Sequence, residues 1–572
     1  MKTLKAVSIL LFAAQLVLGG PKLAKDLPPA SSNAAVKVII QFNGVPTDTQ
    51  LRSLAGGTAA ILRRFDRIKA ACVRVPAHKL PDLEADPFVL YVSPDRSNRG
   101  LLDYTAAAVS AGTAWQLGFD GTGIGVAVID SGVTPDPDFT DTTGLGSRVV
   151  YAESFVTGKG AADEYGHGTH VAGIVGSSGR NSSGAGFTRT FRGLAPNVNL
   201  INLRVLDQNG SGQESDVLAA IQRAIDLKNT YNIRVINLSL GRPVFESYTL
   251  DPLCRAVEAA WKAGIVVVTA AGNNGRNNSQ GTKGYGTIVS PGNDPYVITV
   301  GAMKTNGTYS PSDDTIASYS SKGPTAIDHF VKPDLVAPGN RIISVESPNC
   351  TLATLYPKTV INTAAYETFS SGSASGDYMR LSGTSMATPV VSGAAALLIQ
   401  KQPTLTPDQV KARLMKTATK AVILYSSTID AYTNISYSSQ SDIFTVGAGY
   451  LNIAAALANN DLVTMPALSP VASYNSITRK ASILRDLSVV WGDSVLWGDS
   501  IIWGDAVVFG GTLSLSGPQI LASSVLWGDS IVWGDSTLAG FSVLWGDSTT
   551  TASSLTATSS AEGLSLDLDG EE

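Results

Sequence analysis

Four polar side chains stand where apolar runs of the sequence end or begin, and together their types could do chemistry. Asp130 closes the run GIGVAVID, and His167 lies in HGTHVAGIVG. Asn273 follows VVVTAAG, and Ser385 precedes a long apolar run within GTSMATP. Each has an ordinary structural explanation as a turn cap, a buried histidine, a turn asparagine or a helix cap. Because all four occur along one stretch of the chain, a second interpretation is favoured: a serine hydroxyl held as a nucleophile at a helix start.

The elements that would position these residues follow an alternating pattern between about residues 115 and 459. Short apolar runs such as RVINLSL and YVITVGA alternate with helical stretches such as SDVLAAIQRAIDL. Continuous apolar runs joined by helices predict an α/β domain whose mainly parallel sheet has helices on both faces. Ligands bind such sheets outside the carboxyl ends of the strands, where Asp130 and Asn273 stand.

The segments around the four residues resemble those of subtilisin-like serine peptidases. The similar stretches are GTGIGVAVIDSGV, HGTHVAGIVG, AAGNNG and SGTSMATPVVSG, with GAGYLNIAAAL near the end of the domain. The order Asp, His, Ser along the chain is also the order in that family. The resemblance implies a subtilisin-like fold and a serine endopeptidase that hydrolyses peptide bonds through an acyl-enzyme.

The roles of the four residues follow from the resemblance and from their chemistry. Ser385 is the nucleophile, and His167 is the base that takes its proton and then the acid that protonates the leaving amine. Asp130 holds the imidazole tautomer and stabilises the imidazolium. Asn273 supplies an oxyanion-hole N–H beside the backbone N–H of Ser385.

Substrate contacts are also expected from the resemblance. Two short segments would grip the substrate backbone as neighbouring strands, and a third would line one wall of the main side-chain pocket. The residues are Gly210, Ser211, Gly212, Ser239, Leu240, Gly241, Ala270, Ala271 and Gly272. The chain carries roughly 30 residues more than a compact relative between APGNRIISVES and SGTSMATP, and this insert is expected at the surface near the active site.

No cofactor is required for this chemistry, and metal ligands are not defined by the sequence. HGTH lacks the glutamate of the H-E-x-x-H zinc pattern, so His170 is expected to be structural. Asp138 and Asp141 are candidates for a structural calcium, as the family often binds one, with surface carboxylates as the alternative. Cys254 and Cys350 could form a disulfide or stay as buried thiols, since sequence does not give their separation.

The first hundred residues predict export and a removable cover. Lys2 and Lys5 precede a largely apolar stretch at 6–18 that is too short to span a bilayer, which predicts a signal peptide at 1–19. Residues 20–105 are expected to be an inhibitory pro-segment, with an α+β unit at about 35–97, and 106–462 the peptidase domain. Self-cleavage is expected between Arg96 and Ala114. The alternative is a permanent accessory domain.

The last section, 463–572, is a tail with an internal repeat. Ten hexads of the VLWGDS type run from 489 to 548 and contain six of the eight tryptophans. A triplet of mostly apolar residues followed by a turn predicts a stacked β-array. Residues 481–572 carry a net charge of −11, whereas the whole chain carries −5, so the rest of the chain has a net charge of +6. The array could contact a cell surface or a glycan, or serve as a stability or secretion element.

These features predict a secreted, extracellular or cell-surface peptidase that acts on proteins or peptides as a monomer. The chain has a formal net charge of −5 and no Lys/Arg cluster, which argues against a nucleic-acid partner. Lipases and esterases carry G-x-S-x-G, and GTSMA does not match it. The alternative from another class is a cell-surface binding protein that acts through its tryptophan hexads and has a degenerate peptidase domain.

Overall fold

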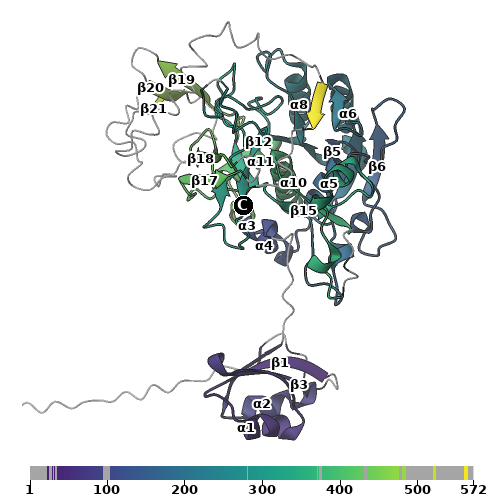
Figure 1. Cartoon of the computed structure of the whole chain (residues 1–572), viewed down its shortest axis with the longest axis vertical. Coiled ribbons are helices and arrows are strands. Elements are labelled where there is room, and N and C mark those ends of the chain that lie inside the picture. The colour runs from purple at the N-terminus through teal and green to yellow at the C-terminus, as the bar shows by residue number, and fades with distance from the viewer. Residues whose placement is uncertain are drawn as a thin grey trace, which may run out of the picture. The chain divides into compact units, whose positions relative to one another are not determined.

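The computed structural model divides the chain into two compact units, Met1–Asn98 and Arg99–Glu572 (Figure 1). The structure describes residues 22–24, 27, 29, 31, 35–94, 104–279, 281–369, 372, 376–430, 434–475, 480–484, 519–522, 560–563 and 571. The predicted signal peptide, 1–19, and most of the hexads lie outside these residues.

The first unit is a small α+β sandwich. Its antiparallel sheet has the order β2-β3-β1-β4, with two short helices beside it. The elements are β1 Ala35–Phe42, α1 Asp48–Ser53, β2 Ala60–Phe65, β3 Ala70–Pro76, α2 Leu80–Ala85 and β4 Val89–Pro94. Alternation along β1 buries Val38, Ile40 and Phe42 against Leu51 and Leu83 of the helices. The α+β unit expected at about 35–97 is therefore present as a sheet with two helices.

The second unit is built on an eight-stranded sheet. Its order is β13-β12-β11-β9-β5-β7-β6, with β14 also beside β12, and every pairing is parallel except that of β13. The strands are β5 Gly125–Asp130, β6 Val149–Ser154, β7 Asn199–Arg204, β9 Ile233–Leu238, β11 Val266–Ala270, β12 Ile298–Lys304, β13 Thr315–Ile316 and β14 Leu335–Pro338. Every residue of β5 and β11 is buried, so both faces are covered and the predicted fold class is confirmed.

Helices form pairs against this sheet. α5 packs on α10, which lies over β9, β11 and β12, while α6 packs on α8 as a second pair. The helices are α3 Thr105–Ala108, α4 Ala111–Gln116, α5 His167–Gly176, α6 Glu214–Asp226, α7 Lys228–Tyr231, α8 Pro252–Lys262, α9 Thr351–Leu355, α10 Thr384–Lys401, α11 Pro407–Thr417 and α12 Ile453–Ala458.

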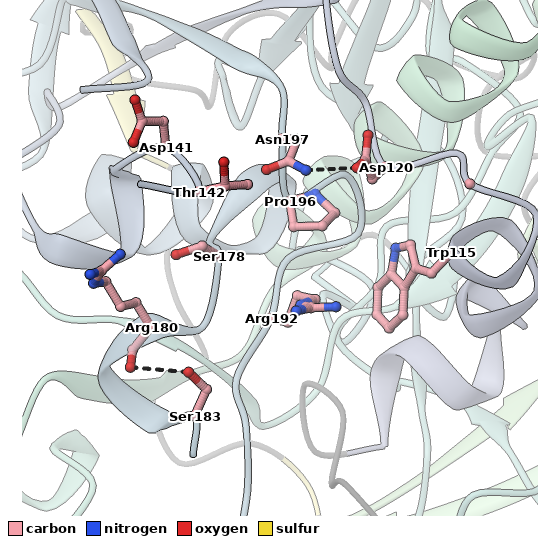
Figure 2. A pocket seen from close by; sticks show the side chains of 11 residues that line it. Trp115, Asp120, Asp141, Thr142, Ser178, Arg180, Ser183, Arg192, Pro196 and Asn197 are labelled. Carbon is pink, nitrogen blue, oxygen red and sulfur yellow. Dashed lines mark hydrogen bonds between the residues drawn. The ribbon is translucent and has the colours of Figure 1, made fainter. Parts of the chain in front are cut away.

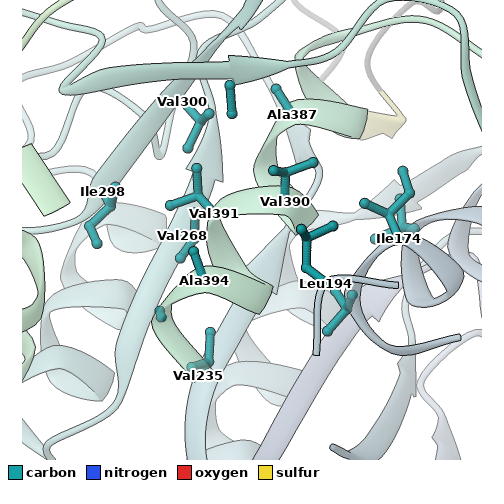
Figure 3. Packing of buried hydrophobic residues seen from close by; sticks show 14 of the residues in the cluster. Ile174, Leu194, Val235, Val268, Ile298, Val300, Ala387, Val390, Val391 and Ala394 are labelled. Atoms are coloured by element: carbon teal, nitrogen blue, oxygen red, sulfur yellow. The ribbon is translucent and has the colours of Figure 1, made fainter. Parts of the chain in front are cut away.

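The central helix α10 is apolar on nearly all sides because it lies between the sheet and α5. Ala387, Val390, Val391 and Ala394 of this helix are fully buried, and they pack among side chains of the strands and of α5 (Figure 3). The small residues allow close approach, which fixes the start of α10 relative to the strand ends. Ser385 lies at that start.

Several smaller sheets complete the unit. Two antiparallel pairs are β15 Ile342–Val345 with β16 Tyr378–Leu381, and β17 Tyr425–Ile429 with β18 Ser436–Gln440. β19 Val471–Asn475, β20 Lys480–Leu484 and β21 Gln519–Ala522 form an antiparallel set, and β21 is the part of the hexad region that the structure describes. β8 Ser211–Gln213, β10 Leu240–Gly241 and β22 Ser560–Gly563 form another.

Packing continues past the predicted end of the peptidase domain at 462. Ala467 and Ala472 belong to the main core, and the backbone N–H of Val331 donates to Pro470 O at 2.8 Å. The compact unit therefore includes the first residues of the predicted tail. No helix in the described parts of the chain is both long and apolar enough to cross a membrane.

Cys254 and Cys350 do not form a disulfide in this structure; both are buried thiols. Cys254 belongs to α8, and its Sγ lies 3.4 Å from Asn293 Oδ1. Cys350 instead precedes α9 in the predicted insert and accepts a hydrogen bond from Ala353 N at 3.4 Å. Of the two alternatives that the sequence left open, the structure has the thiols.

Candidate active site

Asp130 and His167 meet at the carboxyl end of the sheet. Asp130 is the last residue of β5, and His167 is the first of α5. His167 Nδ1 lies 2.7 Å from Asp130 Oδ1, and both side chains are fully buried. Ser131 N also donates to Asp130 Oδ1 at 2.7 Å, which fixes the carboxylate. A buried carboxylate at Nδ1 leaves Nε2 as the nitrogen able to accept a proton.

Four effects set the pKa of His167. Burial lowers it, because the charged ring loses its water, but the negative charge of Asp130 and its hydrogen bond raise it. The buried Asp163 adds to the increase, and the net pKa lies above the usual value. The imidazolium formed during a proton transfer is thus stabilised where it would arise.

Ser385 is the second residue of α10, one position after the helix begins at Thr384. Its Oγ donates to Ser239 O at 3.2 Å, while Ser239 Oγ donates to Ser385 O at 2.8 Å. His167 Nε2 is buried and has no hydrogen-bond partner among the residues that the structure describes. The hydroxyl is therefore bonded to Ser239 O and not to the imidazole in this structure.

Asn273 follows β11 and contacts the residue before Ser385. Its Oδ1 accepts hydrogen bonds from Thr384 N at 2.9 Å and from Thr384 Oγ1 at 3.0 Å. Since the amide oxygen is held by Thr384, the orientation of the amide nitrogen is fixed as well. The neighbouring Gly272 has φ +109°, and an added Cβ would lie 2.8 Å from Ser321 Oγ. A side chain at 272 would displace this loop.

The segments predicted to grip a substrate become two short strands. Ser211 and Gly212 lie in β8, just after Gly210, and Leu240 and Gly241 form β10, just after Ser239. Neither strand pairs with the other; both pair with β22, which runs between them. Ala270 ends β11, and Ala270 and Ala271 are buried beside this sheet. The structure therefore places all nine predicted substrate residues on or beside these two strands and in the loop after β11.

Asp163 is a residue that the sequence analysis missed. Its carboxylate is buried and accepts from Gly166 N at 2.7 Å, Thr169 N at 2.8 Å and Ser131 Oγ at 2.8 Å. It thereby satisfies backbone donors at the start of α5 and ties that start to the end of β5. An acidic residue four positions before HGTH was the available signal.

The predicted insert contacts the backbone that immediately precedes α5. Thr351 N donates to Glu164 O at 3.0 Å, and Leu352 N donates to Tyr165 O at 3.1 Å. A Cβ on Gly166 would clash with Cys350 Sγ, so the glycine allows this close packing. The insert thus supports the backbone that leads into His167.

His170 and the two calcium candidates are engaged in protein contacts. His170 Nε2 lies 3.1 Å from Ile342 O and 3.1 Å from Met379 O, and burial lowers its pKa to about 3. Asp138 accepts from Ser177 Oγ at 2.7 Å and from Asn181 N at 2.7 Å, using both oxygens. Asp141 accepts from Thr143 and Gly144 in its own turn. Asp141 Oδ2 takes no part in these bonds, and a structural calcium at Asp138 and Asp141 stays a prediction.

A cavity of about 410 Å³ is lined by a different set of residues (Figure 2). Trp115, Asp120, Arg180 and Arg192 are among its lining side chains, and Asn197 Nδ2 donates to Asp120 within it. None of the predicted catalytic or substrate-binding residues lines it. The cavity therefore has no part in the chemistry of the Asp130–His167 pair.

Comparison with known proteins agrees with this geometry. The family model described as the subtilase family, Peptidase_S8, matches residues 121–443. The chain is 39% identical to serine protease AprX of Bacillus subtilis over 365 residues, which cover 62% of this chain and 75% of AprX. It is 33% identical to subtilisin E of the same species over 362 residues, or 63% of this chain and 78% of subtilisin E. The chain belongs to the subtilase family and is a serine-type endopeptidase.

Proposed function

We propose that this chain is a secreted subtilase, made as a self-processed zymogen, in which Ser385, His167 and Asp130 act as the catalytic triad. The observation that carries the proposal is the buried 2.7 Å contact between His167 Nδ1 and Asp130 Oδ1. A histidine paired in this way at Nδ1 is oriented to act as a base through Nε2. Ser385 stands at the start of the helix that packs on α5.

The reaction then proceeds in two transfers. Ser385 Oγ attacks the peptide carbonyl while His167 Nε2 takes its proton; the C–N bond breaks as that proton passes to the leaving amine. Water then repeats the sequence on the acyl-enzyme, and Ser385 recovers its proton. Before attack, the hydroxyl must leave Ser239 O, which a rotation about the Cα–Cβ bond of Ser385 accomplishes.

The oxyanion would be stabilised by two donors from different elements. These are the side-chain N–H of Asn273 and the backbone N–H of Ser385 at the start of α10. The contact of Asn273 Oδ1 with Thr384 supports this assignment, since it fixes the amide beside the nucleophile. The mechanism uses only groups of this chain, and a structural calcium at Asp138 and Asp141 remains a prediction from the family resemblance.

The first test is hydrolysis of casein by the secreted protein beside its Ser385→Ala variant, with Ser279→Ala, an exposed serine, as the matched control. We expect activity and labelling by a serine-directed phosphonate in the parent and the control, and neither in Ser385→Ala. A Ser385→Ala protein that keeps its activity would overturn the assignment of the nucleophile.

Maturation is tested in the same samples by sequencing the N-terminus. We expect the parent to start between Arg96 and Ala114 and the Ser385→Ala variant to keep residues 20–105, because the cut is made by the enzyme itself. A variant processed like the parent would show that another protease performs the step. An active parent that keeps the whole segment would favour the permanent accessory domain.

A further inference from the structure

The strand β22, Ser560–Gly563, lies between the two strands that were predicted to grip the substrate backbone. It pairs antiparallel with β8, placing Ala561 opposite Gly212 and Glu562 opposite Ser211. On its other edge it pairs antiparallel with β10, placing Glu562 opposite Gly241 and Gly563 opposite Leu240. Figure 1 shows it as the yellow arrow, and it also contacts α6. A segment from the end of the chain thus occupies the backbone positions that strand addition offers to a peptide.

The chain direction of β22 is that of a peptide running toward Ser385. Its carboxyl end, Gly563, lies opposite Leu240, and the residue before Leu240 is Ser239. Ser239 O is the acceptor of the Ser385 hydroxyl at 3.2 Å. The strand therefore runs toward Ser385 with its carbonyl end leading, which is the direction that a peptide needs to present an acyl group to that hydroxyl.

A second attachment stands at the end of the chain. The Glu571 side chain is fully buried in a pocket of cations and hydrogen-bond donors. Its Oε1 lies 2.9 Å from Arg276 Nη2 and accepts from Ser318 N at 2.8 Å. Its Oε2 lies 3.4 Å from Lys304 Nζ and accepts from Thr428 Oγ1 at 3.2 Å. Each carboxylate oxygen is thus met by one cation and at least one neutral donor.

The backbone of Glu571 is recognised too. Asn340 Nδ2 donates to Glu571 O, and Glu571 N donates to Asn340 Oδ1, both at 2.8 Å. A paired contact of an asparagine side chain with one residue's main chain requires that residue to lie in a single position. Because a buried carboxylate is stable only with such complete partners, this pocket is complementary to the side chain and the main chain of a glutamate.

We propose that the C-terminal end of this chain is an intramolecular ligand of the substrate cleft, with β22 in the substrate position and Glu571 as its anchor. Peptide substrates must displace β22 to reach β8 and β10. The pairing of β22 with β8 and β10 does not depend on catalysis. Its effect on substrate turnover rests on the proposed function. The pocket of Arg276, Lys304, Ser318, Asn340 and Thr428 then sets how readily the cleft opens.

The test uses the chain carrying Ser385→Ala, cut after Arg96 or Arg99 by limited trypsin treatment, freed of the pro-segment and checked by mass for an intact tail. Only the tail can then occupy the cleft, and the enzyme cannot remove it. Hydrogen–deuterium exchange is followed in peptides that cover 207–214 and 238–242. We expect exchange there to accelerate about tenfold in Glu571→Ala, since loss of charge-assisted bonds worth roughly 1.5 kcal/mol shifts an equilibrium by that factor. Glu572→Ala, the adjacent acidic residue, is the matched control and should behave as the parent.

A second variant separates the proposal from damage to the anchor pocket. Ala561→Pro removes a backbone N–H from a strand paired on both edges and should also release β22, whereas Ala552→Pro, outside it, should not. In the same proteins a fluorescent peptide should bind about tenfold more tightly than to the parent, because its competitor is gone. Equal exchange and equal affinity in Glu571→Ala, Ala561→Pro and the parent would overturn the proposal.

These outcomes are independent of whether the parent hydrolyses casein. An inactive parent would refute the proposed function, yet exchange at β8 and β10 would still report whether the tail occupies them. Conversely, an active enzyme whose cleft strands exchange alike in all variants would keep its function and lose this ligand.

Discussion

At the scale of single residues, the Asp130–His167 pair determines how activity depends on pH. His167 must be neutral to accept a proton, and its pKa is raised above the ordinary value of about 6.5. We therefore expect kcat/KM to rise with pH through a value above about 6.5. Asp130→Asn removes the charge that raises the pKa of His167, so the rise of kcat/KM with increasing pH should begin at a lower pH than in the parent. The kcat of this variant should be reduced by about 10⁴. A pH–rate profile of both proteins, with Asp226→Asn as control, measures this.

If kcat/KM rose at the same pH in Asp130→Asn and in the parent, this assignment would be contradicted, because the group that titrates would then not be His167. An activity maximum near pH 4 would do the same.

The oxyanion assignment of Asn273 gives a second prediction at this scale. Asn273→Ala should lower kcat by about 10²–10³ with little change in KM, a magnitude known from subtilases themselves. The loss is confined to the transition state, since the donor acts on charge that develops there. Asn274→Ala, the next residue and an exposed one, is the matched control and should keep the kcat of the parent. A KM effect alone would instead indicate a substrate-binding role.

The sequence predicted that these residues belong together, but not all of their contacts. Motif similarity pointed to Asp130 and His167, and the structure joins them at 2.7 Å. The sequence motifs did not predict that Asn273 Oδ1 would accept hydrogen bonds from Thr384, 111 positions away. Nor did they predict that Asp163 would bind the start of α5. Hydrogen bonds between segments distant in sequence leave no local pattern, so sequence reasoning had no access to them.

At the scale of elements, the start of α5 depends on Asp163. Asp163→Ala should leave the N–H groups of Gly166 and Thr169 unsatisfied and loosen the position of His167. We expect a loss of about 1–3 kcal/mol in the free energy of unfolding and a fall in kcat. Thermal unfolding of the Ser385→Ala protein and kcat of the active one measure the two effects.

Two further variants give this prediction its control. Asp163→Asn keeps an acceptor for part of these bonds and should recover part of the stability. Glu164→Ala changes the adjacent acidic residue, whose partly exposed carboxylate is ion-paired with the buried Arg204. It should have a smaller effect, because Arg204 keeps its backbone carbonyl acceptors at Gly160, Ala162 and Leu206. If Glu164→Ala were the more damaging, the capping role of Asp163 would be wrong.

The elements themselves followed closely from hydrophobic pattern. The runs RVINLSL, GIVVVTAAG and YVITVGA correspond to β9, β11 and β12, and SDVLAAIQRAIDL corresponds to α6. Strong apolar runs are buried on both faces wherever the sheet is parallel, so local sequence is sufficient there. The position of β22 was not predictable, because SAEG has no strand signal and its pairing is set by β8 and β10.

At the scale of the whole molecule, the cleft has two proposed intramolecular ligands. The inhibitory pro-segment that we propose would cover the cleft before maturation, and β22 lies between β8 and β10 in this structure. One pair of strand edges accepts one added strand, so the two cannot be bound together. If both proposals hold, the tail takes the cleft only after the pro-segment has left it, and the two segments cover the cleft in succession.

The second unit is also held together by a buried charge cluster that reaches past residue 462. Asp334 Oδ2 lies 2.7 Å from Lys332 Nζ, and Oδ1 lies 3.3 Å from Lys411 Nζ. Ser469, from the predicted tail, donates to Asp334 Oδ1 at 2.6 Å. All three charged side chains are fully buried. Asp334 thus joins the sheet, α11 and the segment after the predicted domain boundary.

Removing this carboxylate should destabilise the unit strongly. Asp334→Ala removes the partner that the buried Lys332 and Lys411 share, and we expect a loss of about 3–5 kcal/mol in the free energy of unfolding. Asp226→Ala, on the exposed side of α6, should change it by less than about 0.5 kcal/mol. Urea unfolding of both variants in the Ser385→Ala protein gives the difference.

The pH dependence of that stability supplies the check on the cause. Burial raises the pKa of Asp334, but the charges of Lys332 and Lys411 outweigh it and hold the pKa below its usual value. A carboxyl with a lowered folded pKa stabilises fully above the unfolded value of about 3.9, and the contribution is lost as pH falls through the folded pKa. The difference between parent and Asp334→Ala should therefore be largest near neutral pH and shrink in acid. A difference that stays constant down to the acid limit would mean that lost packing, not the charge of Asp334, holds Ser469 and its segment to the sheet.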